Sequence, residues 1–449
     1  MKQILILGAG HSSAFLISHL LELASQREWF VTVGDLDLEL ARTRVGDHAS
    51  GKAIHFDVND ATLRSGQIEL ADVVINMLPP TYQGLVAWDC VNQGRHMLSV
   101  SYQDQAVRDL EQDARQRGVL LLCELGLDPG IDHMSAMAMI RRLHDQGGAV
   151  RGFQSYGSGI PAPDQPHNPL RYVVTWNPRN VAMSGEAGAQ YLENGRIKIV
   201  PFHHVFHHTW EVDVDGIGRL EAYPNRDSLA YLDAFGLEGV ETMIRGTLRY
   251  PGWSETWAQI VSLGLPNEVV RIPDLARRSY REVVEMFLPL NITEASIEQR
   301  IARSLHISPT GRIMENLRWL GLLSDEPVGC AGDTAAAMLI HLLQKKLPLT
   351  EGMRDVVVLV HQLDVVYPEG QRPAERITST LVSTGEPGGP TAMARTVGLP
   401  TAAAAQLLLD GKLPLTGCHI PTHPLVYKPV LRELSAAGLE FSEKSQALE

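Results

Sequence analysis

Three residues near the start of the chain have the types and spacing of a dinucleotide-binding turn: Gly8, Gly10 and, about 20 residues beyond the motif, Asp35. In such a turn the first glycine permits a tight bend, and the second lets the backbone approach the pyrophosphate. The next helix binds phosphate through its N-terminal N–H groups, and the acid binds the ribose hydroxyls. The pattern predicts a nicotinamide nucleotide site whose cofactor-binding residues are Gly8, Gly10, His11, Ser12, Ser13 and Asp35.

The choice of nucleotide depends on the acids at the end of the second predicted strand. Asp35 and Asp37 would repel a 2′-phosphate, and no arginine directly follows that strand to bind one. Ser13 stands where a third glycine is usual, so an ordinary turn with a surface acid is the alternative. We expect NAD or NADP as the cofactor, with NAD favoured by Asp35.

The turn must lie between a strand and a helix, and the sequence provides both. Apolar Ile4–Leu7 predicts a buried strand, amphipathic Phe15–Leu23 predicts a helix, and Phe30–Val33 predicts a second strand. Four more strand-like runs follow at intervals long enough for crossover helices; they are Ala53–Phe56, Asp72–Met77, Met97–Ser101 and Val119–Cys123. The predicted fold class is α/β, with a doubly wound parallel sheet of the Rossmann type.

Ligands of such sheets bind at the carboxyl ends of the strands. This rule adds residues after the later strands to the expected cofactor site: Asp57, Val58, Leu78, Pro79 and Leu125. Ser101 and Tyr102 come at the end of the fifth strand and face the same site. For each single residue the alternative is an ordinary strand end.

A turn rich in glycine and proline, Gly126–His133, leads into an apolar helix expected at Met134–Leu143. Asp132 is well placed to cap that helix. Asp128 has no such local role, so we expect its carboxylate to face the crevice between domains. The alternative is an acid that stabilises the turn before Pro129.

Several longer sequence motifs carry a family resemblance. They are Gly126–His133, Asn168–Leu170, Tyr223–Ser228, Arg245–Tyr250, Arg354–Val357, Ser379–Leu381, Gly388–Gly389 and Ala392–Ala394. With them the chain resembles saccharopine dehydrogenase of the glutamate-forming type, also called saccharopine reductase. The likeness runs nearly end to end. Several motifs in the same order along the chain indicate a family more specifically than the glycine turn alone does.

The resemblance implies a Rossmann domain with a C-terminal return, a second α/β (α+β) domain for substrate binding and dimerisation, and a small helical insertion. We expect these three domains at residues 1–125 and 391–449, 126–261 and 347–390, and 262–346. Ser262–Lys346 is rich in helix formers, and strand-like runs flank it at Val150–Tyr156 and Val356–Val360. The apolar helix Thr391–Leu409 is expected to pack back against the first domain.

The same resemblance implies the reaction. Oxidation of saccharopine removes hydride from the carbon next to its secondary amine, and hydrolysis of the imine gives glutamate and 2-aminoadipate 6-semialdehyde. Because the substrate has three carboxylates, the site needs several cations, and arginine binds a carboxylate with two parallel hydrogen bonds. The resemblance assigns catalysis to Asp128 and Tyr102, and substrate binding to Ser101, Gly159, Arg226, Arg245 and Thr247. Arg249 lies in the same motif as Arg245. For Arg249 the alternative to substrate binding is an internal salt bridge.

One position departs from the family. Where the resembling enzymes have Tyr-Cys-Gly-Gly-Leu-Pro, this chain has Tyr156–Pro161 with Gly157 in place of the cysteine. Two alternatives therefore stay open. One is a carboxynorspermidine-type reductase that acts on a related amine, and the other is a non-catalytic dinucleotide-binding protein with a regulatory or assembly role.

The composition limits the classes of molecule that the protein is expected to bind. The net charge of -13 repels nucleic acid, the four cysteines are scattered as in reduced proteins, and no apolar run approaches the roughly 20 residues of a membrane-spanning helix. We expect a cytoplasmic protein with a small amino-acid substrate, no nucleic acid or membrane partner, and the homodimer that the resemblance implies. No metal is expected, because the histidines of residues 203–208 lack acidic or thiol neighbours. The second candidate cluster, Cys418–His419 with His423, is predicted to be a structural loop.

Overall fold

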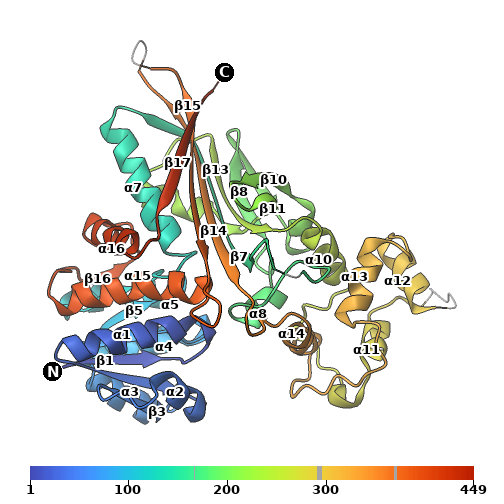
Figure 1. Ribbon diagram of the computed structural model, residues 1–449, viewed down its shortest axis with the longest axis horizontal. Coiled ribbons are helices and arrows are strands. Elements are labelled where there is room, and N and C mark those ends of the chain that lie inside the picture. The colour runs from blue at the N-terminus through green and yellow to red at the C-terminus, as the bar shows by residue number, and fades with distance from the viewer. Residues whose placement is uncertain (166, 291–295, 369–371, 449) are drawn as a thin grey trace. The chain divides into compact units, whose positions relative to one another are not determined.

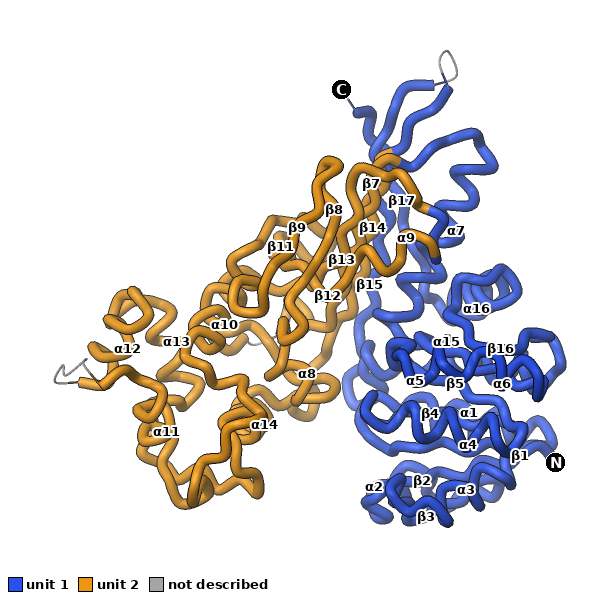
Figure 2. Tube along the Cα trace, turned by 180° about the vertical axis from the view of Figure 1, so that it is seen from behind, with its two compact units in different colours: residues 1–150, 234–236, 365–449 blue, residues 151–233, 237–364 orange. Residues whose placement is uncertain are grey.

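The computed structural model describes residues 1–165, 167–290, 296–368 and 372–448. The chain forms two units, which Figure 2 colours separately. The first contains residues 1–150, 234–236 and 365–449, and the second contains residues 151–233 and 237–364. The division into three domains stays a prediction.

The first unit is built on a seven-stranded parallel sheet (Figure 1). Its strand order is β16-β6-β5-β4-β1-β2-β3, and every neighbouring pair is parallel. The strands are β1 Lys2–Leu7, β2 Trp29–Asp35, β3 Gly51–His55, β4 Val73–Asn76, β5 His96–Ser99, β6 Leu120–Leu122 and β16 Gly417–His419. The predicted Rossmann sheet is confirmed. The inner strands are apolar because both faces of the sheet are covered there; β4, for example, is buried at every residue, whereas the edge strand β3 has no buried residue.

The seventh strand corrects one prediction. The sequence predicts a loop at Cys418–His419, but these residues form part of β16 and pair with Leu121–Leu122 of β6. The Cys418 nitrogen also donates to Glu111 Oε2 at 2.5 Å. A three-residue strand is too short to show a period-two pattern, so it is recognisable only once the sheet edge beside it is known.

Helices and a pair of antiparallel strands complete the first unit. The helices are α1 Ala14–Gln26, α2 Leu38–Val45, α3 Ala61–Glu69, α4 Gln83–Gln93, α5 Gln105–Arg108, α6 Glu111–Gln116, α7 Ile131–Asp145, α15 Ala392–Leu409 and α16 Pro424–Ala436, with short 3-10 helices at His11–Ser13 and Pro80–Tyr82. The two strands are β15 Glu375–Thr384 and β17 Phe441–Ala447.

Helix α15 packs on α1 at a glycine. A Cβ at Gly398 would lie 2.9 Å from the Leu16 nitrogen and 3.0 Å from the Phe15 ring, so only glycine allows this approach. Close by, Thr401 Oγ1 donates to the Leu125 oxygen at 2.9 Å. A helix from the end of the chain thus supports both the helix after the glycine turn and the segment after β6 (Figure 1).

The second unit contains a mixed sheet, in which β11 is antiparallel to β10 and β13, and β13 is parallel to β7. The strands that lie mainly in it are β7 Ala149–Pro161, β8 Ala189–Glu193, β9 Arg196–Val200, β10 Trp210–Val214, β11 Gly218–Pro224, β12 Arg226–Asp227, β13 Thr242–Arg249 and β14 Asp355–Val366. The helices are α8 Pro178–Ala182, α10 Trp253–Ser262, α11 Tyr280–Met286, α12 Ile297–Leu305, α13 Arg312–Leu320 and α14 Ala335–Lys346, and the short helix α9 Leu232–Phe235 is divided between the two units.

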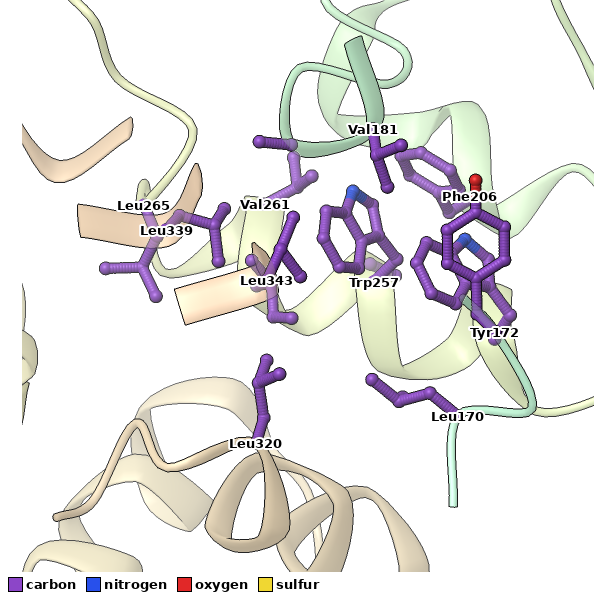
Figure 3. Packing of buried hydrophobic residues seen from close by; sticks show 14 of the residues in the cluster. Leu170, Tyr172, Val181, Phe206, Trp257, Val261, Leu265, Leu320, Leu339 and Leu343 are labelled. Atoms are coloured by element: carbon purple, nitrogen blue, oxygen red, sulfur yellow. The ribbon is translucent and has the colours of Figure 1, made fainter. Parts of the chain in front are cut away.

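The helices that follow β13 share one hydrophobic core with the sheet of this unit. Figure 3 shows the packing around Trp257 of α10, with Leu339 and Leu343 of α14 on one side and Tyr172 on the other. Trp253 stacks on Trp257 with 4.6 Å between ring centroids. The helical segment is therefore packed against the sheet of this unit.

Gly398→Ala is expected to destabilise the protein, although alanine forms helices better than glycine. The gain in helix propensity is about 1 kcal/mol, whereas overpacking against α1 costs about 1–3 kcal/mol. The control is Gly66→Ala in α3, where no described atom lies within 4 Å of the added Cβ, so that the propensity gain acts alone. Thermal unfolding should move the midpoint down for the first variant and up for the second; shifts of the same sign would contradict the close contact.

Candidate active site

The carboxyl ends of the parallel strands meet at one edge of the first unit's sheet, because neighbouring strands run in the same direction. The expected cofactor and catalytic residues of this unit all follow those ends. They are Gly8, Gly10, His11, Ser12 and Ser13 after β1, Asp35 at the end of β2, Asp57 and Val58 after β3, Leu78 and Pro79 after β4, Ser101 and Tyr102 after β5, and Leu125 and Asp128 after β6. The fold thus brings them to one edge, and their binding roles stay proposals.

Gly8 and Gly10 meet different requirements of the turn. Gly8 has φ +105°, and a Cβ there would lie 3.1 Å from the backbone of Met77. At Gly10 no described atom lies within 4 Å of the Cβ position, so the backbone is open on that side. Ser13 is 1% exposed and donates from Oγ to the Gly10 oxygen at 3.0 Å. The open backbone ahead of α1 fits a phosphate group.

Asp35 and Arg44 contact the same residue of the glycine turn, Ala9. Asp35 Oδ2 accepts from the Ala9 nitrogen at 2.7 Å, and Oδ1 accepts from the Asp37 nitrogen at 2.9 Å. Arg44 Nε donates to the Ala9 oxygen at 3.2 Å. Each carboxylate oxygen has two lone pairs, so Asp35 retains capacity for ribose hydroxyls. Sequence spacing does not indicate Arg44, because it lies in the last turn of α2 and only the fold returns it to Ala9.

A buried ion pair holds the loop after β3. Arg64 Nε lies 2.6 Å from Asp89 Oδ2, both side chains are less than a tenth exposed, and Arg64 Nη1 donates to the Val58 oxygen at 2.5 Å. Asp57 Oδ1 accepts from the backbone and side-chain nitrogens of Asn59. Sequence reasoning missed Arg64 and Asp89, because a single sequence does not show that residues on α3 and α4 pair.

A buried amide lies at the end of β4. Asn76 is fully buried, and its Oδ1 accepts from the Leu78 nitrogen at 3.2 Å. Its Nδ2 has no hydrogen-bond partner within the described residues. A buried donor costs free energy unless a ligand or water accepts from it. Because β4 neighbours β1, this donor fits a dinucleotide bound at the glycine turn.

Tyr102 and Asp128 form a hydrogen-bonded pair at the same edge. Tyr102 Oη donates to Asp128 Oδ1 at 3.4 Å, and both residues are half-buried. Asp128 lies in a turn closed by two hydrogen bonds of 2.9 Å, from the Gly126 nitrogen to the Pro129 oxygen and from the Ile131 nitrogen to the Gly126 oxygen. A half-buried carboxylate beside a phenol is suited to take up and release a proton.

Gln83 holds the Tyr102 loop and was not indicated by the sequence. It is fully buried at the start of α4, and its Nε2 donates to the Tyr102 oxygen at 2.7 Å. Ser99 Oγ donates to Gln83 Oε1 at 2.5 Å and accepts from the Ser101 nitrogen at 3.2 Å. A lone glutamine has no sequence signal, so only the fold reveals this role.

Asp132 is not the N-cap that the sequence predicts. Helix α7 begins at Ile131 with Gly130 as its N-cap, so Asp132 lies inside the first turn. Its Oδ1 accepts from the Gly130 nitrogen at 2.6 Å. The boundary lies earlier than predicted because Ile131, at the end of the tight turn, is already helical.

In the second unit, strand pairing brings the expected substrate residues near one another. The Asn225 nitrogen donates to the Arg245 oxygen at 2.9 Å, which places Arg226 beside β13. Thr247 lies on β13 and pairs with β7, the strand that contains Gly159. These four expected residues therefore lie on β7, β12 and β13.

Arg245 and Arg226 have different surroundings. Arg245 is 3% exposed, its backbone nitrogen donates to Ser228 Oγ at 2.9 Å, and its guanidinium lies 4.5 Å from the centre of the Tyr231 ring. Arg226 is exposed and has φ +56°, which is uncommon for a residue other than glycine. One cation is held in place by packing, and the other faces solvent.

The salt-bridge alternative for Arg249 is wrong. Arg249 is 4% exposed, and Nη1 donates to Ser158 Oγ and to the Leu248 oxygen, each at 2.8 Å. Its guanidinium lies 4.8 Å from the Tyr172 ring centre, and no carboxylate among the described residues pairs with it. Burial raises the pKa of neighbouring Tyr223. A hydroxyl, a carbonyl and aromatic rings thus take the place of a counterion.

The histidine cluster of the sequence lies in the second unit. Residues Phe202–His207 form a 3-10 helix, on which the rings of His203 and His204 lie 4.5 Å apart. Across the described parts of the chain, no three His, Cys, Asp or Glu side chains gather in a way that could hold a metal ion. Among the same residues, no helix is long and apolar enough to cross a membrane.

Comparisons with known proteins cover the whole chain. The family model described as "Saccharopine dehydrogenase NADP binding domain" matches residues 4–122, and the "Saccharopine dehydrogenase C-terminal domain" matches residues 126–439. The chain is 32% identical over 470 aligned residues to "Saccharopine dehydrogenase [NADP(+), L-glutamate-forming]" of Schizosaccharomyces pombe, covering 99% of each chain. It is 33% identical to the mitochondrial alpha-aminoadipic semialdehyde synthase of Bos taurus, of which it covers 48%.

A solved structure agrees with these matches. The apo, histidine-tagged saccharopine dehydrogenase (L-Glu forming) from Saccharomyces cerevisiae superposes with a TM-score of 0.86 at 30% sequence identity, covering 100% of both chains. Fold, family models and full-length relatives therefore agree, and the chain belongs to the saccharopine dehydrogenase family.

Proposed function

We propose that this protein is an NAD(P)-dependent saccharopine dehydrogenase that oxidises the secondary amine of saccharopine to give glutamate and 2-aminoadipate 6-semialdehyde, or catalyses the reverse. The observation that carries the proposal is the Tyr102–Asp128 pair, 3.4 Å apart at the edge of the sheet that bears the glycine turn. Relatives with this named activity align along 99% of the chain.

Asp128 is the proposed proton acceptor. Bound NAD(P)+ supplies the hydride acceptor for the carbon next to the amine. The Asp128 carboxylate takes the proton from the substrate's ammonium group, which frees the nitrogen lone pair to form the imine as hydride leaves. Water then adds to the imine carbon, and Asp128 and Tyr102 accept and return protons as the carbon–nitrogen bond breaks.

Arg226, Arg245, Thr247 and Gly159 are proposed to bind the substrate, and Ser101 is a further proposed substrate residue. Arg245 and Arg226 each suit a carboxylate, because a guanidinium makes two parallel hydrogen bonds with it. Arg245 is already held over the Tyr231 ring, so little freedom is lost when it binds. Ser101 and Thr247 are proposed as hydroxyl donors to the substrate, and Gly159, which is buried on β7, as a further contact.

We propose NAD as the preferred nucleotide, although the family model and the Schizosaccharomyces pombe relative are named for NADP. Support comes from Asp35, whose carboxylate is held at the Ala9 nitrogen, where its charge would repel a 2′-phosphate. Arg44 on the Ala9 oxygen is the opposing influence. The preference therefore depends on the balance of these two charges.

We also propose a cytoplasmic homodimer that binds neither nucleic acid nor membranes. The four cysteines are unpaired thiols, as in reducing compartments, and the net charge is -13. Support for the dimer comes from the family resemblance. Light scattering on the purified protein measures the assembly directly.

The purified protein is expected to oxidise reduced nucleotide with glutamate and 2-aminoadipate 6-semialdehyde. Asp128→Asn should lower kcat by at least about 100-fold, since it removes the proton acceptor, without changing the dissociation constant of the nucleotide. Asp113→Asn, on the exposed face of α6, is the charge-matched control and should match wild type. Turnover only with a diamine and aspartate semialdehyde would favour the carboxynorspermidine-type reductase, and tight nucleotide binding without turnover would favour the non-catalytic protein.

Arg226→Ala is expected to raise KM for saccharopine by about 10- to 100-fold, which corresponds to the loss of a charge-assisted hydrogen bond. The nucleotide KM should not change. Arg219→Ala removes an exposed cation of the same sheet and serves as the control. A KM for saccharopine unchanged in Arg226→Ala would remove this residue from the site.

Asp35→Asn is expected to shift affinity toward NADPH relative to NADH by about tenfold, because a charge facing the 2′-phosphate is removed. The asparagine oxygen can still accept from the Ala9 nitrogen, so the turn should persist. Fluorescence titration with both nucleotides gives the ratio, and Asp47→Asn, exposed after the far end of α2, is the control. An unchanged ratio would mean that Asp35 does not face the ribose.

A further inference from the structure

A buried histidine connects the two segments that contain Tyr102 and Asp128. His133 of α7 has 0% exposure, and its Nε2 lies 2.7 Å from Glu124 Oε2. Its Nδ1 lies 3.3 Å from Asp132 Oδ2, in contact but without the geometry of a hydrogen bond. Both carboxylates are buried as well, with 2% and 3% exposure. The proposed reaction gives no role to this histidine or to these two acids.

Glu124 holds the backbone on both sides of Tyr102. Its nitrogen donates to the Ser101 oxygen at 3.1 Å, and its Oε1 accepts from the Gln103 nitrogen at 3.0 Å. Glu124 also has φ +62°, a conformation uncommon for residues other than glycine, which the surrounding hydrogen bonds maintain. The place of Tyr102 therefore depends on the direction of the Glu124 carboxylate.

Asp132 does the same for Asp128. Its nitrogen donates to the Leu127 oxygen at 3.1 Å, and its Oδ1 accepts from the Gly130 nitrogen at 2.6 Å. Each acid thus bonds the backbone before and after one member of the pair. The second carboxylate oxygen of Glu124 is hydrogen-bonded to His133, and that of Asp132 contacts the same ring. His133 thus bonds the Glu124 carboxylate and lies next to Asp132 in the first turn of α7.

We propose that His133 is a positioning residue, which sets the distance between Tyr102 Oη and Asp128 Oδ1 by holding the Glu124 and Asp132 carboxylates in a fixed relation. This rests on the proposed roles of the pair. Two buried carboxylates repel each other, and the imidazole lies between them, hydrogen-bonded through Nε2 to Glu124. Its ring also packs edge-on against Phe235, 5.4 Å away between centroids, which fixes its orientation.

Three substitutions separate the two contacts. His133→Phe removes both and keeps a ring, His133→Gln places an amide near the former Nε2, and His133→Asn places one near Nδ1. With saccharopine and nucleotide, kcat should fall about 100-fold in the phenylalanine variant, the loss expected for a misplacement of about 1 Å, and less in the two amide variants. The dissociation constant of the nucleotide should stay within about twofold. His144→Gln, exposed on the same helix, is the control and should match wild type.

A cycle with Tyr102→Phe distinguishes positioning from a general loss of structure. If His133 acts through the pair, His133→Gln should lower kcat much less when Tyr102 is already phenylalanine. An equal loss in both backgrounds, or a kcat of His133→Phe within about threefold of wild type, would overturn the proposal. If the phenylalanine variant does not fold, the amide variants in the two backgrounds decide. Absence of saccharopine turnover in the wild type would instead refute the proposed function.

Discussion

The common direction of the strands in the first unit's sheet is the constraint on which the rest of the structure depends. Because β1 to β6 are parallel, segments as distant in sequence as Gly8 and Asp128 leave from the same edge. An antiparallel neighbour would take Tyr102 to the opposite edge. The topology therefore brings the nucleotide turn and the proton-handling pair together before any side-chain contact is made.

Buried polar contacts then fix the loops at that edge. Gln83 holds the Tyr102 oxygen, the Arg64–Asp89 pair holds the loop after β3, and Thr401 holds the Leu125 oxygen. Each of these contacts satisfies groups that would otherwise cost free energy in the interior. The edge combines rigid backbone with an open face at Gly10, which is the combination that nucleotide binding requires.

The sequence predicts what local patterns determine. Six strands and the glycine turn follow from apolar runs and from Gly8 and Gly10, and the strand-end rule with the family resemblance selects Tyr102 and Asp128. It does not predict β16, the contact at Gly398 or the surroundings of Arg249, because each depends on a partner far away in the chain. Long-range pairing of buried residues leaves no periodic trace in one sequence.

A crystal structure with saccharopine and reduced nucleotide, which cannot react with each other, tests the central claim most directly. The account predicts a dinucleotide along the open backbone of Gly10, with the amine nitrogen of saccharopine about 2.6–3.2 Å from the Asp128 carboxylate. An amine nitrogen beyond hydrogen-bond reach of both Asp128 and Tyr102, with the nucleotide bound and ordered, would contradict it.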